Sequence, residues 1–327
     1  MQPLVDNHGR TMDYLRLAVT ERCNLRCQYC MPENGIQLRP KKEILTWEEQ
    51  LRLSKIFIGL GVKKIRITGG EPFVRKGLLN FIQDLRSTSD SLKIGITTNG
   101  TLINQHLREL LNLGVQHLNF SLDSLDSETF HRITRRDHFA ETVHAIEAAY
   151  EMGFRVKVNM VAIPGMNLHE IPEFVEWTRN RNMEIRFIEP MPFDGNGKKF
   201  EQTVSGDDIR EIIESEYPVE KIAGENSAVA TRFRVPGFAG TVGIIYGATR
   251  SFCGTCSRLR VSAQGQMRTC LYGLTVLDLR NLLRNQASDA EIISEIRGAV
   301  NRRYKDGFAA EQARKESQFD SMAAIGG

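Results

Sequence analysis

The sequence predicts an α/β fold, a partial (β/α)6 TIM-type barrel with a C-terminal extension. Two observations carry this prediction. Strand-like runs rich in Ile, Val and Leu alternate with helical periodicity six times before about residue 191, as expected of strands buried on both faces. A glycine also separates several helical runs from the strands that follow them. Such alternation indicates a parallel sheet. An open doubly wound sheet is the alternative, but no G-x-G-x-x-G motif supports a dinucleotide-binding version of it.

The individual elements follow from local signals. Thr46 and Glu49 form a predicted capping box at the start of the first helix. Glycines at three helix-to-strand junctions predict left-handed caps, namely Gly61, Gly114 and Gly153. The six predicted strands are Tyr14–Thr20, Val62–Thr68, Lys93–Thr98, Val115–Ser121, Phe154–Val161 and Met183–Glu189.

The repeat stops near Gly195, where a glycine-rich polar loop begins. We therefore expect an N-terminal lead over residues 1–12, the barrel over 13–200, and a C-terminal region over 201–327 that ends in a Gly-Gly tail. Within this last region, Ser205 begins a helix, short strands lie between 221 and 246, and a late helix covers 290–304.

Composition is typical of an ordinary globular protein. Of 327 residues, 41% are apolar and 25% charged, and the net charge is +3, which is too small to indicate nucleic acid or a membrane as partner. The N-terminus lacks the apolar core of a signal peptide, so we expect a cytoplasmic location. Six cysteines in a reducing compartment are poor candidates for disulfides, and they divide into two sets of three.

The first set is Cys23, Cys27 and Cys30, with the spacing C-x3-C-x2-C. A closed zinc site takes four ligands, and a four-iron cluster normally takes four cysteines. Three cysteines would leave one iron open to a small chelating molecule. The alternative is a zinc knuckle completed by a distant His or Cys.

The second set is Cys253, Cys256 and Cys270, with the spacing C-x2-C-x13-C. A zinc ribbon needs a second close pair, and all seven histidines occur at or before residue 169. A second three-cysteine iron–sulfur site fits better. Beside it, Arg258 and Arg260 place two guanidinium groups that could grip a polyphosphate.

Basic residues also interrupt apolar strands. Arg16, Arg66 and Lys157 each lie between two apolar neighbours, and alternation points them to the opposite face, which in a barrel is the lumen. Burying cations in the lumen without partners is costly. Their presence therefore indicates that an anionic substrate binds there. A wet, open barrel side is the alternative.

Polar residues follow several strands, at the barrel end where catalytic groups gather. They include Gly69-Gly70-Glu71, Thr97-Thr98-Asn99, Ser121-Leu122-Asp123, Asn159 and Glu189-Pro190-Met191. Each could instead cap the next helix, although that alternative explains five strand ends less well than one.

The cysteine loop after the first strand and the GGE motif after the second resemble the radical S-adenosylmethionine (radical SAM) superfamily. In that superfamily the open iron chelates S-adenosylmethionine. An electron from the 4Fe-4S cluster releases a 5′-deoxyadenosyl radical, which removes a hydrogen atom from the substrate.

The two cysteine spacings, Arg258-x-Arg260 and the terminal Gly326-Gly327 together resemble the GTP 3′,8-cyclase family of molybdenum cofactor biosynthesis. The resemblance runs from about residue 12 to 285, plus the tail. It implies two 4Fe-4S clusters and conversion of GTP to 3′,8-cyclo-7,8-dihydro-GTP. It implies S-adenosylmethionine contacts at Tyr29, Gly70, Ser121 and Met191. It implies GTP contacts at Arg16, Arg66, Thr97, Lys157, Arg258, Leu259 and Arg260, and a late catalytic role for Gly326 and Gly327.

The same resemblance implies an electron donor of unknown identity, a downstream cyclic pyranopterin monophosphate synthase, and a monomer or homodimer. Two other functions remain open. A peptide-modifying radical SAM maturase with an auxiliary cluster usually carries more C-terminal cysteines than three. A zinc-binding interaction module would be no enzyme at all.

Overall fold

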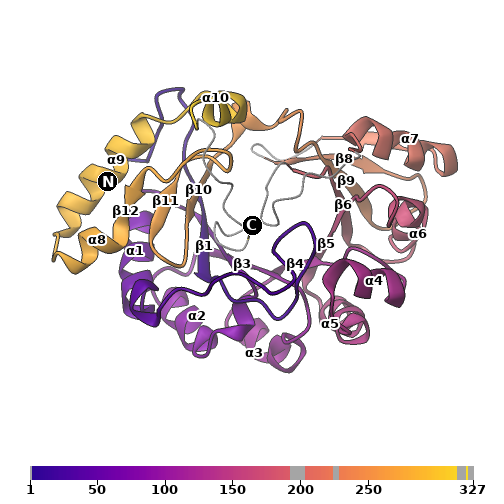
Figure 1. The fold of residues 1–327 in the computed structure, drawn as a ribbon, viewed down its shortest axis with the longest axis horizontal. Coiled ribbons are helices and arrows are strands. Elements are labelled where there is room, and N and C mark those ends of the chain that lie inside the picture. The colour runs from indigo at the N-terminus through magenta and orange to yellow at the C-terminus, as the bar shows by residue number, and fades with distance from the viewer. Residues whose placement is uncertain (1, 192–202, 224–227, 315–321, 323–327) are drawn as a thin grey trace.

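The computed structural model describes residues 2–191, 203–223, 228–314 and 322 of the chain. Its centre is a curved sheet with helices on the outer face (Figure 1). Within the described residues the sheet has twelve strands in the order β12-β11-β10-β1-β2-β3-β4-β5-β6-β9-β8-β7. No pairing among them joins β12 to β7, so the sheet is open, and the predicted partial barrel is confirmed.

The first six strands are parallel to one another. They are β1 (Tyr14–Thr20), β2 (Lys64–Gly69), β3 (Lys93–Thr98), β4 (His117–Ser121), β5 (Arg155–Val161) and β6 (Glu184–Ile188). The helices between them are α1 (Trp47–Gly59), α2 (Leu78–Arg86), α3 (Leu107–Asn112), α4 (Ser127–Thr134), α5 (Phe139–Glu151) and α6 (Ile171–Glu176).

The predicted element boundaries agree closely with the structure. β1 and β3 match the prediction, whereas β2, β4, β5 and β6 begin one or two residues later. Each of these predictions begins at a buried apolar residue that enters the core just before its strand, namely Val62, Val115, Phe154 and Met183. The Thr46–Glu49 capping box is present. The three junction glycines have positive φ, at 95°, 71° and 85° for Gly61, Gly114 and Gly153.

The C-terminal region extends the same sheet at both edges. After α7 (Gly206–Glu216), the strands β7 (Glu220–Ile222), β8 (Ala230–Arg234) and β9 (Thr241–Ile245) form an antiparallel unit, whose β9 lies parallel to β6. At the opposite edge, β10 (Arg258–Val261) lies parallel to β1. Two antiparallel strands follow, β11 (Gln266–Arg268) and β12 (Leu277–Asp278). The remaining helices are α8 (Leu279–Arg284), α9 (Asp289–Asn301) and α10 (Gly307–Gln312).

Strand alternation separates the core from the lumen. In β1, Leu15, Leu17 and Val19 are completely buried and belong to the main apolar cluster that also includes residues of the surrounding helices. The intervening Arg16 lines a cavity on the other face. The curved sheet therefore presents its polar side chains to the inside. Within the described residues, no helix is both long and apolar enough to cross a membrane.

Candidate active site

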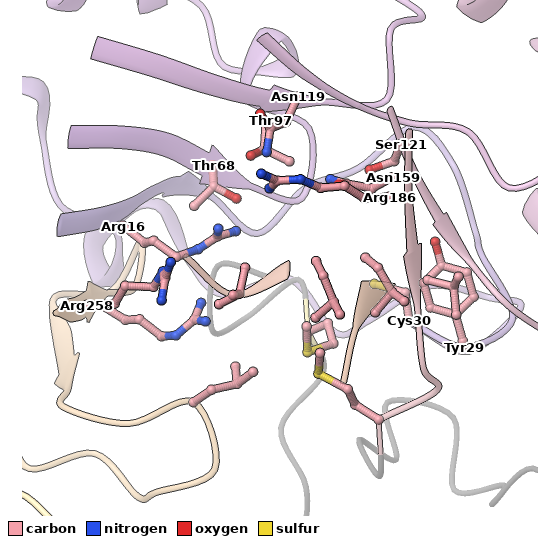
Figure 2. A pocket seen from close by; sticks show the side chains of 18 of the residues that line it. Arg16, Tyr29, Cys30, Thr68, Thr97, Asn119, Ser121, Asn159, Arg186 and Arg258 are labelled. Atoms are coloured by element: carbon pink, nitrogen blue, oxygen red, sulfur yellow. The ribbon is translucent and has the colours of Figure 1, made fainter. Parts of the chain in front are cut away.

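The inner face of the sheet holds a cavity of about 320 Å³, within the usual range for small-molecule sites. Both cysteine sets contribute to its wall, as do the C-terminal ends of the parallel strands. The predicted site residues that line it are Arg16, Cys23, Cys27, Tyr29, Cys30, Gly70, Thr97, Ser121, Met191, Cys253, Cys256, Arg258, Arg260 and Cys270. Figure 2 shows Arg16 and Arg258 on one side of this space and Cys30 and Tyr29 on the other.

The cationic side of the cavity is built by strand register. Arg16 on β1 is paired with Arg260 on β10 and with Arg66 on β2, and paired residues on parallel strands point to the same face. Burial, followed by the charge of Arg260, lowers the pKa of Arg16 to about 9. The guanidinium groups of Arg16 and Arg260, which both line the cavity, repel each other, so an anion bound between them would lower the electrostatic cost of burying both.

Tyr14 lies at the base of this group. Its hydroxyl accepts a hydrogen bond from Arg66 Nε at 2.8 Å, and Arg258 lies over its ring, 5.3 Å from the centroid. Burial raises its pKa, but the charges of Arg66, Arg16, Lys64 and Arg258 outweigh this and lower the pKa to about 6. The surrounding cations therefore create a positive potential at Tyr14 that favours its ionised form.

Arg66 and Lys157 do not line the cavity as the structure describes it. Arg66 is buried and donates to Ile96 O at 2.9 Å, in space left by Gly95, where a Cβ would lie 3.0 Å from its guanidinium. Lys157 has a partner, contrary to the expectation from sequence, because register places it opposite Glu184, 2.7 Å away.

Arg186 on β6 is a cavity residue that the sequence analysis missed. Its Nε donates to Glu184 Oε1, and its register partner on β5 is Asn159. The charges of Arg186 and Lys157 outweigh burial and lower the pKa of Glu184 to about 2. Arg186 lies between Ile185 and Phe187, so the pattern that identified Arg16 would also have found it.

Leu259 is completely buried, and alternation points it away from Arg258 and Arg260. Its side chain belongs to the main apolar cluster and not to the cavity wall. Gly326 and Gly327 lie outside the described residues.

The first cysteine loop is held by the GGE motif. Gly70 N donates to Thr20 O, and Glu71 N donates to Arg22 O, both at 2.8 Å. A Cβ on Gly70 would lie only 2.2 Å from the Arg22 carbonyl oxygen, so the close approach requires glycine. The second strand end therefore fixes the start of the cysteine loop.

Buried carboxylates complete the support of this loop. The Tyr29 hydroxyl donates to Asp123 Oδ2 at 2.8 Å, and burial raises the pKa of Asp123 to about 6. Glu71 accepts hydrogen bonds from Thr98 and from Asn99 N, and burial raises its pKa to about 7. These contacts explain why polar residues follow the strands here.

Two thiols of the first set, those of Cys23 and Cys27, lie in surroundings that favour the protonated form. Burial raises the pKa of Cys23 to about 12, with a further contribution from Glu71, and burial raises the pKa of Cys27 well above its usual range. Metal-binding cysteines must be thiolates, so metal binding at this loop has to release protons.

The second set comes from three segments: Cys253 in a short 3-10 helix, Cys256 before β10, and Cys270 after β11. Although burial raises the pKa of Cys256, the charges of Arg303 and Arg258 lower it to about 7. This thiol is therefore the most easily ionised of the second set, since the pKa values of Cys253 and Cys270 are raised, and a positively charged environment of this kind favours the thiolate that binds metal.

The donor set fits iron–sulfur clusters. All six thiols are free, all line one cavity, and the thiols of each set influence one another's pKa values. Thiolates are the ligands of such clusters. Among the described residues, no three His, Cys, Asp or Glu side chains already stand as a preformed site for a metal ion.

Comparison with known families agrees with this fold and site. Residues 17–178 match the model of the radical SAM superfamily, and residues 183–308 match the model described as Molybdenum Cofactor Synthesis C. The chain is a radical SAM protein, whose superfamily cofactors are 4Fe-4S clusters and S-adenosylmethionine. Two sets of three thiols fit two such clusters, as the sequence analysis predicted.

Relatives identify the family more closely. The chain is 42% identical over 293 residues to the GTP 3′,8-cyclase of Thermodesulfovibrio yellowstonii, covering 88% of this chain and 90% of that one. It is 39% identical over 326 residues to the mitochondrial GTP 3′,8-cyclase of Arabidopsis thaliana, covering 99% and 83%. The chain belongs to the GTP 3′,8-cyclase family.

Other relatives are longer. The molybdenum cofactor biosynthesis protein 1 of Drosophila melanogaster is 44% identical over 306 residues, which cover 93% of this chain but 54% of that protein. The chain thus spans about half the length of several curated relatives. Among solved structures, Streptococcus suis SuiB shares the fold, with a TM-score of 0.60, 14% identity, and coverage of 97% and 78%.

Proposed function

We propose that the chain converts GTP to 3′,8-cyclo-7,8-dihydro-GTP in molybdenum cofactor biosynthesis. The observation that carries the proposal is that two three-thiol sets and a group of arginines face one cavity. When bound, the first cluster with S-adenosylmethionine supplies a 5′-deoxyadenosyl radical that can abstract the hydrogen atom from the ribose C3′ of GTP. Attack of the C3′ radical on guanine C8 would then close the new ring, and one further electron from the electron donor, together with a proton, would give the closed-shell 7,8-dihydro product. The named activity of the two cyclase relatives supports this assignment.

The chain's own residues would divide between the two bound molecules. Cys23, Cys27 and Cys30 would hold the first cluster. Cys253, Cys256 and Cys270 would hold the second cluster, whose open iron would take the guanine. The S-adenosylmethionine contacts would be Tyr29, Gly70, Ser121 and Met191, all in the cavity wall.

The triphosphate would be held by guanidinium groups. Arg16, Arg258 and Arg260 line the cavity together, and arginine binds phosphate oxygens with two parallel hydrogen bonds. Thr97 would add a hydroxyl contact. We propose that Arg66 and Lys157 contact GTP after leaving Ile96 O and Glu184, and that Leu259 contributes through its backbone. Arg186 extends the same cationic wall toward the first cysteine loop (Figure 2).

The finer predictions are part of the same proposal. Residues 13–200 would form the radical SAM unit and 201–327 the auxiliary-cluster unit, although both contribute strands to one sheet. Gly326 and Gly327 would act late, organising the radical step rather than holding a cluster. The enzyme would be cytoplasmic, a monomer or homodimer, reduced by a separate electron donor and followed by a cyclic pyranopterin monophosphate synthase.

Anaerobic purification followed by metal and product analysis tests the proposal. We expect about eight irons and matching sulfide per chain, as two four-iron clusters require. We also expect 5′-deoxyadenosine and cyclised GTP after addition of S-adenosylmethionine, GTP and dithionite. Zinc without iron would favour the interaction module. Iron with S-adenosylmethionine cleavage but no change in GTP would favour a peptide-modifying maturase.

A further inference from the structure

The second cysteine set is braced by two arginines from distant parts of the chain. Arg10 lies in the N-terminal lead, and Arg303 follows α9. Both approach the carboxylate of Asp6: Arg10 Nε lies 2.7 Å from Oδ2, and Arg303 Nη1 lies 3.7 Å from it. The Asp6 side chain is completely buried, and the Arg303 side chain is 3% exposed. Two positive charges therefore share one buried negative charge.

Both arginines also bind the cysteine loop directly. Arg303 Nη1 donates to Cys256 O at 2.8 Å, and Nη2 lies 3.2 Å from Cys256 Sγ. Arg10 Nη1 donates to Cys253 O at 2.9 Å. Two of the three thiols of this set are thus fixed through their backbone carbonyls, and one of these two also receives a hydrogen bond at sulfur.

The group formed by Asp6, Arg10 and Arg303 carries a net positive charge. Asp6 neutralises one of the two arginines, which leaves about one positive charge beside Cys256. A fixed cation and an N–H···S hydrogen bond both stabilise the more negative, reduced state of an iron–sulfur cluster, since hydrogen bonds to sulfur and net charge set its reduction potential.

We propose that Arg303 is a positioning residue of the second cluster: it orients Cys256 and raises the reduction potential of the cluster that this thiol holds. The inference rests on the proposed presence of that cluster. Arginine is required because its planar fork reaches the carbonyl and the sulfur of one residue together, which a lysine ammonium cannot reproduce. Arg10 and Asp6 complete the brace, so the N-terminal lead takes part in the auxiliary site.

The test compares Arg303→Met with Arg303→Lys, and Arg302→Met serves as the matched control because Arg302 is an exposed neighbour. In Arg303→Met, Asp6 keeps Arg10 as partner, so no buried carboxylate is left unpaired. Each variant is prepared anaerobically, both in the full chain and together with Cys27→Ala, so that the signal of the second site can be read alone. Iron content and an EPR-monitored redox titration are measured.

We expect Arg303→Met to make reduction of the second cluster at least about tenfold less favourable, a shift of about 59 mV to more negative potential for one electron. Arg303→Lys should shift the potential in the same direction by less, and Arg302→Met should leave it unchanged. Loss of iron from the second site alone in both Arg303 variants would also support the positioning role.

An unchanged potential together with full iron content in Arg303→Met would overturn the inference. If the unsubstituted protein binds no second cluster, the premise of the inference fails, whereas a second cluster without conversion of GTP would overturn the proposed function and leave the redox comparison valid. Thermal unfolding of the metal-free variants checks that each one folds.

Discussion

Replacing Gly70 with alanine tests the contact between the GGE motif and the first cysteine loop. An alanine Cβ would lie 2.2 Å from the Arg22 carbonyl oxygen, 2.6 Å from its carbon and 2.9 Å from Glu21 O. The first of these distances is about 1.2 Å inside the 3.4 Å at which ordinary contact begins. All three atoms belong to the backbone just before Cys23, so relief requires the cysteine loop itself to move.

The expected cost follows from that geometry. Forcing a methyl group into a packed site typically costs about 1–3 kcal/mol, and the upper part of this range applies because no flexible side chain can give way. The Gly70 backbone does not have positive φ, so the effect arises from crowding and not from an unfavourable conformation. We expect lower thermal stability of the metal-free protein and loss of iron from the first site only.

Gly254→Ala is the matched control, because it lies in the second cysteine loop and a Cβ there meets nothing within 4 Å. The assay compares melting temperature, iron per chain after reconstitution, and 5′-deoxyadenosine formation for both variants. If Gly70→Ala behaves like Gly254→Ala in all three measurements, the close approach does not position the cysteine loop.

Four further predictions concern the proposed cluster ligands, the proposed GTP contacts, Glu184 and the C-terminal tail. Cys27→Ala should keep the fold but abolish 5′-deoxyadenosine formation, whereas Cys270→Ala should retain that formation and lose cyclised product; product analysis separates the two, and normal cyclisation by Cys270→Ala would make the second set structural. Arg258→Ala should weaken GTP binding by about 1.5–3 kcal/mol, the scale of a charge-assisted hydrogen bond, and unchanged affinity in a titration would remove Arg258 from the triphosphate site. Glu184→Gln should destabilise the metal-free protein by about 3 kcal/mol at pH 7, because it strands buried positive charge. Since the pKa of Glu184 is lowered to about 2, its contribution is present above about pH 4.5 and is lost as pH falls toward 2, so denaturant unfolding should show the difference shrinking in that window. Deletion of Gly326-Gly327 should leave iron content and S-adenosylmethionine binding near normal but strongly reduce cyclised product, and an unaffected rate would make the tail dispensable.

Strand alternation was sufficient to place Arg16 in the lumen, because side-chain direction in a strand depends only on local geometry. The same alternation in Ile185-Arg186-Phe187 predicts that Arg186 also points into the lumen. It could not predict the partner of Lys157, since that pairing depends on the register between β5 and β6. Register depends on both strands of a pair, so it cannot be predicted from the sequence of either strand alone.

The contacts of Arg10, Arg303 and Asp6 with the second cysteine set could not be predicted from the sequence for a different reason. Arg10 and Arg303 are separated by almost the whole chain, and each has the neighbours of an ordinary polar loop. Their meeting at Asp6 depends on β10 returning to the edge of β1. Periodicity predicted the parallel strands from residue 14 to 188 almost to the residue, but it contains no information on which later strand joins which edge.

The way in which β9 and β10 complete the sheet also bears on how the chain folds. During synthesis the six parallel strands are made first. The outer edge of β1 can pair only after β10, about 240 residues downstream, has been made, and the outer edge of β6 can pair only after β9 has been made. Until then both sheet edges expose unpaired backbone groups, which are templates for aggregation. Such distant pairings form slowly because loop closure precedes the contacts that stabilise it. A fragment ending near residue 190 would keep every predicted strand of the barrel and the first three cysteines, but both of its edges would stay open. We expect that fragment to be recovered as aggregate, although it contains the whole first cysteine site.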